Sequence, residues 1–234
     1  MGPDTITQSK AVRDLCIYID FDLSMQVHVQ QSVAGCFVVL RHLCSIRLFV
    51  PSSVYQSLVF ALVLSRLDYG NATLAGFLAS LLNRLQSVLS AAAQSIAGLR
   101  CSEHIEDAVI GFHWLRGPER IKVKLAVNVY QAFHGTACRY LSGQLQYVAD
   151  LLLGLAALIY FQSSQRPSVS TFTVGDHVFV AAGPRLWNSL PVDVQSAPSL
   201  TPFRQKLKTH LFRQSYPDIV FSCFTIVVFE ITFM

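Results

Sequence analysis

Charged residues are scarce in this sequence. Asp, Glu, Lys and Arg make up 14% of its 234 residues, whereas typical soluble domains contain about 25%. Hydrophobic residues account for 52%, and the mean hydropathy is +0.44. This composition excludes a disordered, collagen-like or coiled-coil chain. It leaves an unusually apolar globular protein, a membrane protein, or part of a larger protein whose remainder covers exposed apolar surface, and we favour the last of these.

The sequence also lacks a long hydrophobic run. The two best candidates, at 151–161 and 219–229, are eleven residues each, and a membrane-spanning helix needs about 18 or more. A membrane partner is therefore not expected, although an anchor at 219–234 stays open as an alternative. The first ten residues contain no apolar stretch typical of a signal peptide. We expect an intracellular protein, cytoplasmic or nuclear.

Clustered cysteines and catalytic motifs are absent as well. The six cysteines form no C-x-x-C pair, so the sequence predicts neither a zinc site nor a disulfide framework, and scattered thiols are typical of a reducing compartment. A ligand set of Cys36, His42 and Cys44 is the remote alternative to packing of these residues in a core. No hydrolase, metalloprotease or P-loop motif accompanies the histidines and serines. The sequence therefore predicts no catalytic residue, metal site or cofactor.

What the sequence does contain is helical periodicity. Residues 12–19 show the partial alternation of a strand that enters a turn at 20–22. Gly98 and Gly135 are expected to end two of the helices that follow. A β-hairpin is predicted at 171–180, with its turn at Gly175 and Asp176. Helices are predicted over 24–49, 52–67, 78–97, 118–133 and 201–213.

These elements predict a mainly α fold. It consists of a helical bundle with one N-terminal strand and a small C-terminal β-hairpin plus helix. The predicted parts are a strand remnant at 1–22, a bundle at 23–140, an irregular connection at 141–170, a hairpin-plus-helix module at 171–216 and an apolar tail at 217–234.

Positive charge is distributed unevenly along the chain. Residues 23–102 contain five arginines and one acid. Residues 199–216 contain four basic residues and no acid. In the predicted C-terminal helix, Phe203, Leu207 and Leu211 are expected to face inward. Such a helix suits contact with RNA or DNA phosphates, and a solvated helix face is the alternative interpretation. The basic residues expected to face outward are Arg204, Lys206, Lys208 and Arg213.

Two short blocks carry a family resemblance. They are LDYGN at 67–71 and WNSLP at 187–191. Over roughly residues 12–218, the chain resembles the C-terminal part of a LINE-type, non-long-terminal-repeat retrotransposon reverse transcriptase of the jockey-like clade. The resemblance implies the end of a palm, then a helical thumb-like bundle and a C-terminal region. It is supported by the stretches at 12–29, 51–76, 81–96, 113–135 and 183–212.

The resemblance also bears on chemistry. In such enzymes, palm carboxylates upstream of the region resembled here hold two Mg²⁺ ions for nucleotide addition. The segment YIDFD at 18–22 looks like the family's Tyr-x-Asp-Asp turn, but its carboxylates lie at i and i+2, and we interpret them as turn-forming. We therefore expect a truncated reverse transcriptase remnant that lacks the catalytic palm and is inactive alone. The alternatives are a nucleic-acid-binding thumb module and a membrane-associated protein that uses the 219–234 tail.

Overall fold

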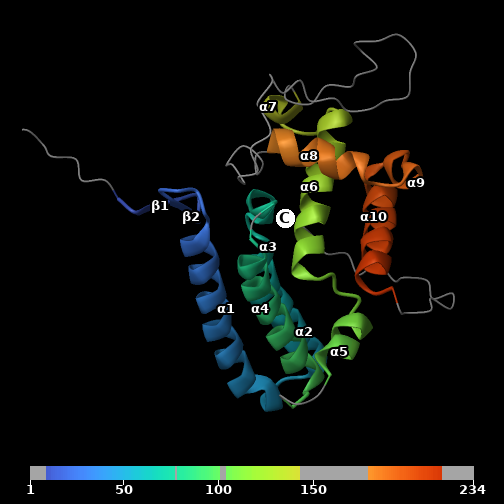
Figure 1. The fold of residues 1–234 in the computed structure, drawn as a ribbon. Helices are drawn as coiled ribbons and strands as arrows, with labels where there is room; N and C mark the ends of the chain where they lie inside the picture. The colour runs from blue at the N-terminus through green and yellow to red at the C-terminus, as the bar shows by residue number, and fades with distance from the viewer. Residues whose placement is uncertain (1–8, 77, 101–103, 143–178, 218–234) are drawn as a thin grey trace, which may run out of the picture. The chain divides into compact units, whose positions relative to one another are not determined.

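The computed structural model describes residues 9–76, 78–100, 104–142 and 179–217. These residues are mainly helical, as the sequence predicts, and they include a two-stranded sheet near the N-terminus (Figure 1). They belong to two compact units. Unit 1 comprises the described residues up to 112, and unit 2 comprises 113–142 and 179–217. This division falls within 23–140, the range predicted from the sequence to be one bundle.

Unit 1 begins with a β-hairpin and continues as helices. Strands β1 (Ala11–Asp14) and β2 (Ile17–Asp20) pair antiparallel. Helix α4 packs against both α1 and α2, and the three run side by side in Figure 1. The helical elements are α1 (Gln26–Ile46), η1 (Arg47–Phe49), α2 (Ser52–Val59), η2 (Phe60–Leu64), α3 (Ser65–Asp68), η3 (Asn71–Leu74), α4 (Ala79–Ala97) and α5 (Ile105–Gly111).

The single strand predicted at 12–19 is instead a tight hairpin. Leu15 and Cys16 form its turn with φ values of 43° and 65°. Two consecutive residues with positive φ give the two-residue turn that matches the twist of antiparallel strands, but Asn and Gly usually occupy it. The turn was missed because neither residue carries that signal. Arg13 and Tyr18 face each other across the strands, with the guanidinium carbon 5.6 Å from the ring centroid.

The apolar helix predicted over 52–67 contains a π-turn. The helix starts at Ser52 as predicted, and its backbone changes from α to π geometry over Phe60–Leu64. A π-turn widens the helix and shifts its hydrogen-bond register. The buried Cys36 thiol on α1 donates to the Val63 carbonyl at 3.8 Å. Burial raises the Cys36 pKa to about 11, so the thiol keeps its proton at neutral pH.

The predicted end of α4 is confirmed at Gly98. This residue has a φ of 74° and its N–H donates to the Gln94 carbonyl at 2.9 Å. A left-handed residue after the last helical turn is the geometry that glycine adopts without strain. A Cβ atom at this position would collide with the guanidinium of Arg47, which lies against the end of α4. The backbone conformation therefore favours glycine here, whereas the flexible Arg47 side chain could move aside for a larger residue.

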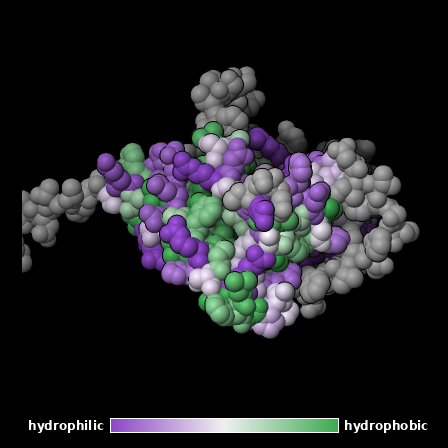
Figure 2. Space-filling model, turned by 90° about the horizontal axis from the view of Figure 1, so that it is seen from below, coloured by the Kyte–Doolittle hydropathy of each residue, from purple (hydrophilic) through white to green (hydrophobic). Residues whose placement is uncertain are grey.

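Large apolar side chains are exposed around the end of α1. Leu48 is 93% exposed and Phe49 is 84% exposed, both in η1. In the view from below in Figure 2, hydrophobic residues occur among hydrophilic ones on the displayed face. Gln26–Phe49 is the one helical stretch among the described residues that is long and apolar enough to cross a membrane, with a mean hydropathy of 1.5 over an 18-residue window. Helices of soluble proteins pass the same test, so this stretch is weak support for a membrane location.

Unit 2 is built from two long helices and several short ones. Helix α6 packs against both α8 and α10. Pro118 lies in the first turn of α6, and Gly135, with a φ of 67°, follows its end, both as predicted. Its helices are α6 (Gly117–Phe133), α7 (Arg139–Ser142), α8 (Phe179–Asn188), α9 (Val192–Gln195) and α10 (Leu200–Ser215).

Aromatic side chains form the centre of unit 2. The Phe203 ring stacks on Tyr130 at 4.4 Å between centroids and on Trp187 at 5.7 Å. The Tyr130 hydroxyl donates to the Ala197 carbonyl at 3.1 Å, which satisfies the polar end of a buried ring. The prediction that Phe203, Leu207 and Leu211 face inward is confirmed, since all three are buried.

The predicted C-terminal hairpin lies mostly outside the described residues. Only its last two positions, 179 and 180, are described, and they open helix α8 instead of ending a strand. Apolar residues at 178–180 fit either pattern, because alternation over so few positions does not separate a strand from the first turn of an amphipathic helix. The tail predicted at 217–234 lies outside the described residues beyond Pro217.

Candidate nucleic-acid interface

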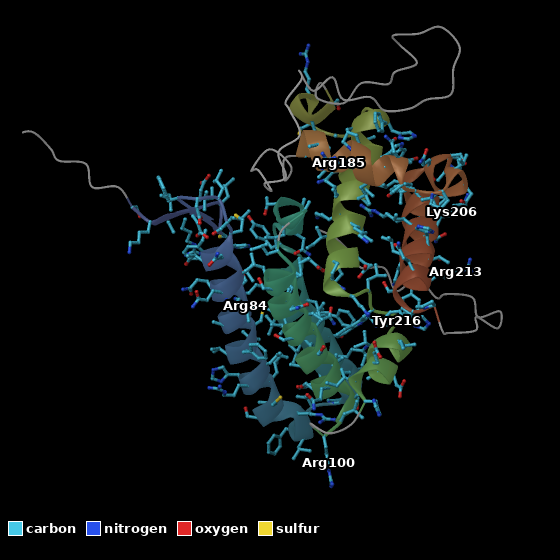
Figure 3. The ribbon with its side chains drawn as sticks, viewed as in Figure 1. Arg84, Arg100, Arg185, Lys206, Arg213 and Tyr216 are labelled. Carbon is cyan, nitrogen blue, oxygen red and sulfur yellow. The ribbon has the colours of Figure 1, made fainter. Side chains whose placement is uncertain are left out.

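The four basic residues predicted on the C-terminal helix do not share one face. At 100° per residue, Arg204 and Lys208 lie about 40° apart, and Lys206 and Arg213 lie about 20° apart on roughly the opposite side of α10. Burial agrees with this division. Lys206 and Arg213, marked on α10 in Figure 3, are exposed as predicted. Arg204 and Lys208 are half-buried, because they flank the apolar stripe of the helix.

One residue of the exposed pair, Lys206, also stabilises the fold. The Lys206 ammonium donates to the backbone carbonyl of Asp193 at 2.9 Å. This bond joins α10 to α9, and the two helices also pack together. One of the three N–H donors of the Lys206 ammonium is therefore hydrogen-bonded within the protein.

The half-buried pair lies in a different environment. The Arg204 Nε atom is buried and has no hydrogen-bond partner among the described residues. Burial lowers the pKa of Lys208, and the nearby positive charge of Arg120 on α6 lowers it further. Arg120 therefore lies near Lys208 where α6 and α10 pack together.

The contribution of α6 was missed from the sequence. Arg120 and Lys124 are four residues apart, the same spacing as Arg204 and Lys208, and this spacing places two side chains on one helix face. That signal was present, but the sequence does not reveal which helix packs against α10. Arg116, just before α6, stacks over the Tyr216 ring at 4.9 Å.

Unit 2 carries a large excess of positive charge. Its described residues include ten Lys and Arg side chains and two acids, Glu119 and Asp193. Glu119 lies 3.6 Å from the Lys122 ammonium in the first turn of α6, where a carboxylate also offsets the helix dipole. The cations are Arg116, Arg120, Lys122, Lys124, Arg139, Arg185, Arg204, Lys206, Lys208 and Arg213.

The aspartates of YIDFD bind the backbone around the start of α1. The buried Asp20 carboxylate accepts a hydrogen bond from the Val27 N–H at 3.1 Å and another from the Ser24 hydroxyl at 2.9 Å. Asp22 accepts from the Ser24 N–H at 3.1 Å, and that bond lowers the pKa of Asp22. The Asp20 carboxylate therefore caps the first turn of α1. The turn-forming interpretation of this pair agrees with these bonds.

An open hollow of about 410 Å³ lies beside these aspartates. Its lining includes Lys10, Asp20 and Asp22. Across the described residues, no group of three or more His, Cys, Asp and Glu side chains is arranged to hold a metal ion. Cys36, His42 and Cys44 are not brought together, because Cys36 is buried in the core and the other two are exposed. The predicted core position is therefore confirmed for Cys36 but wrong for His42 and Cys44.

The two sequence blocks behind the family resemblance have structural roles. In the first, the Tyr69 hydroxyl donates to the Leu15 carbonyl at 2.6 Å and so joins the hairpin to the end of α3, while Asn71 donates to Asp68 at 2.9 Å. In the second, the backbone carbonyls of Trp187 and Leu190 both accept from the Gln195 side chain at 2.8 Å. No protein-family model, curated protein or solved structure matches this chain.

Proposed function

We propose that this chain is a non-catalytic part of a LINE-type retrotransposon reverse transcriptase, and that its unit 2 binds the phosphate backbone of RNA or DNA inside the cell. The observation that carries the proposal is the charge of unit 2, where ten cations accompany two acids among the described residues. The family origin comes from the LDYGN and WNSLP blocks. Residues of both blocks make hydrogen bonds within the fold.

The physical basis of such binding is counterion release. A protein that neutralises backbone phosphates with Lys and Arg displaces condensed cations, so its affinity falls steeply with salt. The exposed cations of α10 and those of α6 belong to packed helices, which hold their backbones in place before any ligand arrives. Binding to a preformed surface costs less conformational entropy than ordering a flexible tail.

We test this proposal by titrating the full chain against a fluorescently labelled RNA–DNA primer-template duplex. We expect a slope of log K against log salt of about −3, so that affinity falls about 60-fold between roughly 50 and 200 mM salt. The control is the double variant Arg41→Gln, Arg84→Gln, which removes two exposed cations from unit 1 and should leave the slope unchanged. No binding, or a slope near zero, contradicts the proposal.

The non-catalytic part of the proposal has its own test. Asp20 and Asp22 use carboxylate oxygens to hold the Val27 and Ser24 backbone groups, an arrangement suited to ending a hairpin and starting a helix. Primer extension by the full chain with Mg²⁺ and all four deoxynucleotides should therefore give no product. Extended primer that disappears in an Asp20→Asn variant would show that the chain polymerises nucleotides itself.

A further inference from the structure

The connection between α1 and α2 exposes a group of large apolar side chains. Leu48 and Phe49, adjacent in η1, are almost fully exposed, and Ile46 and Val54 on either side of them are exposed as well. We call these four residues the apolar tip of unit 1. Contact of large apolar side chains with water is unfavourable. An exposed apolar group is typical of a surface that contacts a protein or a membrane.

Contacts on both sides of η1 hold the apolar tip in place. After it, the Tyr55 N–H donates to the Pro51 carbonyl at 2.9 Å, and the hydroxyl of the buried Tyr55 ring hydrogen-bonds with Ser95 on α4. Before it, the Arg47 side chain lies against the end of α4 at Gly98. The exposed side chains are therefore presented on a preformed turn, and binding to a preformed surface costs less conformational entropy.

The helices around the apolar tip carry arginines and no acid. Helices α1, η1, α2 and α4 contain Arg41, Arg47 and Arg84. At 1.5 Å per helical residue, Arg41 lies about 10 Å from Leu48 along α1, and Arg84 lies about 20 Å from the end of α4. A charge acts over about 10 Å at 0.1 M salt. An anionic surface that touches the tip is therefore within reach of Arg41 and Arg47, but not of Arg84.

A second exposed apolar group in unit 1 lies among acids. Leu15 and Phe21, in and just after the hairpin, are also largely exposed. The surrounding residues 9–22 contain two basic residues and three acids. The two groups thus present the same pair of residue types in opposite electrostatic surroundings, and only the apolar tip is complementary to an anionic partner. The charged residues around the hairpin are Lys10, Arg13, Asp14, Asp20 and Asp22.

We propose that the apolar tip inserts into the surface of a membrane that contains anionic lipids. Leu48 and Phe49 enter the boundary of the acyl chains, and Arg41 and Arg47 contact the headgroups. A bilayer places an apolar layer directly beneath an anionic one, whereas a nucleic-acid backbone offers charge without that layer. A stable protein interface takes about 20–30 residues on each side, many more than the tip supplies. The tip belongs to unit 1 and does not depend on nucleic-acid binding by unit 2.

The main test measures sedimentation of the full chain with vesicles of phosphatidylcholine that contain about 30% phosphatidylserine. Leu48→Ser, Phe49→Ser removes the two most exposed side chains of the tip without changing charge. Leu15→Ser, Phe21→Ser removes the same residue types from the hairpin. We expect the tip variant to bind at least about 10-fold more weakly than the wild type and the hairpin variant to bind within about twofold of it.

The same experiment can overturn the proposal. The cations of unit 2 also attract anionic lipids, so binding of the wild type alone does not support insertion of the tip. Equal binding by the wild type and the tip variant, equal losses in the two variants, or no binding at all would each contradict it. Self-association that disappears in the tip variant, without vesicle binding, would instead assign the tip to an interface between copies of the chain.

Single arginine variants test the orientation of unit 1 on the membrane. Arg41→Gln should weaken binding to the vesicles with phosphatidylserine by about fivefold, because each basic residue near an anionic surface contributes about that factor. It should leave binding to pure phosphatidylcholine unchanged. Arg84→Gln, farther from the tip, should change binding less than about twofold. Equal effects of the two substitutions would contradict contact through the tip.

A fluorescence measurement detects insertion directly. Both native tryptophans, Trp114 and Trp187, are buried in unit 2. Phe49→Trp places an exposed indole at the tip, and vesicles with brominated acyl chains should quench its emission well beyond any quenching of the wild type. Leu15→Trp provides the matched control at the hairpin and should show no added quenching. Absence of added quenching in the Phe49 variant would show that the tip stays outside the bilayer.

Discussion

The two units use their charged residues differently. The described part of unit 1 has seven Lys and Arg residues and six acids, whereas unit 2 has ten and two. In unit 1 the acids hold local structure: Asp20 caps α1, and Asp68 accepts from Asn71. In the described part of unit 2 cations outnumber acids five to one. Net charge alone, +4 for the whole chain, hides this contrast, which is the basis of the proposal that unit 2 binds a phosphate backbone.

The cores of the two units differ as well. Unit 1 is packed mainly by aliphatic side chains such as Val29, Val59 and Val88, each with no exposed surface. Unit 2 is packed by an aromatic cluster around Phe203. Both tryptophans of the chain, Trp114 and Trp187, are in unit 2 and are buried. Tryptophan fluorescence therefore reports on unit 2, while circular dichroism reports on the helices of both units, and the comparison can be tested unit by unit.

The largest expected effect comes from the aromatic core. Phe203→Ala removes a fully buried ring that stacks on Tyr130 and Trp187, so it should lower the free energy of unfolding by about 3–5 kcal/mol. Urea unfolding followed by tryptophan fluorescence measures this loss. The matched control is Phe49→Ala in unit 1, where the ring is 84% exposed and the cost should be within about 0.5 kcal/mol. A small effect at Phe203 would mean that this cluster does not hold unit 2 together.

A smaller effect is expected at the start of α1. Asp20→Ala removes the carboxylate that accepts from the Val27 N–H and the Ser24 hydroxyl, and loss of such a cap costs about 0.5–2 kcal/mol. The transition followed by circular dichroism should shift, and the tryptophan transition should not. Asp22→Ala serves as the control, because Asp22 is exposed and accepts one local bond. If Asp20→Ala shifts both transitions equally, the two units do not unfold separately and the comparison between them fails.

The sequence was sufficient for features that depend on local signals. Helix α4 and its end at Gly98, the start of α6 at Pro118 and the inward stripe of α10 all follow from residue types at fixed spacing. The turn at Leu15 and Cys16 was not predictable, because its positive φ values are imposed by the strands on either side. The π-turn at Phe60–Leu64 was missed for a related reason, since its backbone is supported by contact with α1.

The candidate site was only half predictable from the sequence. All four cations on α10 were found, because they precede and follow apolar residues in a short amphipathic helix. Their separation into two flanks follows from helical geometry and could have been worked out at that stage. The position of Arg120 beside Lys208 could not be predicted from the sequence. It depends on α6 packing against α10, a contact between segments about 80 positions apart along the chain.

The smallest expected effect concerns pH and belongs to unit 1. His28 is buried, and its Nδ1 atom accepts from the Tyr18 N–H at 3.4 Å, a bond that requires an unprotonated nitrogen. Burial lowers the pKa of His28 below the ordinary value of 6.5, and the negative charge of Asp20 partly opposes this. As pH falls through 6.5, the unfolded chain therefore binds a proton at His28 before the folded unit does. The free energy of unfolding should decrease over that interval and level off below the folded pKa.

Urea unfolding followed by circular dichroism at several pH values measures this decrease. His28→Asn, which keeps an acceptor for Tyr18 but does not titrate, should remove it, whereas replacement of the exposed His42 by Gln should not. An unchanged pH dependence in the His28 variant would assign the effect to other groups.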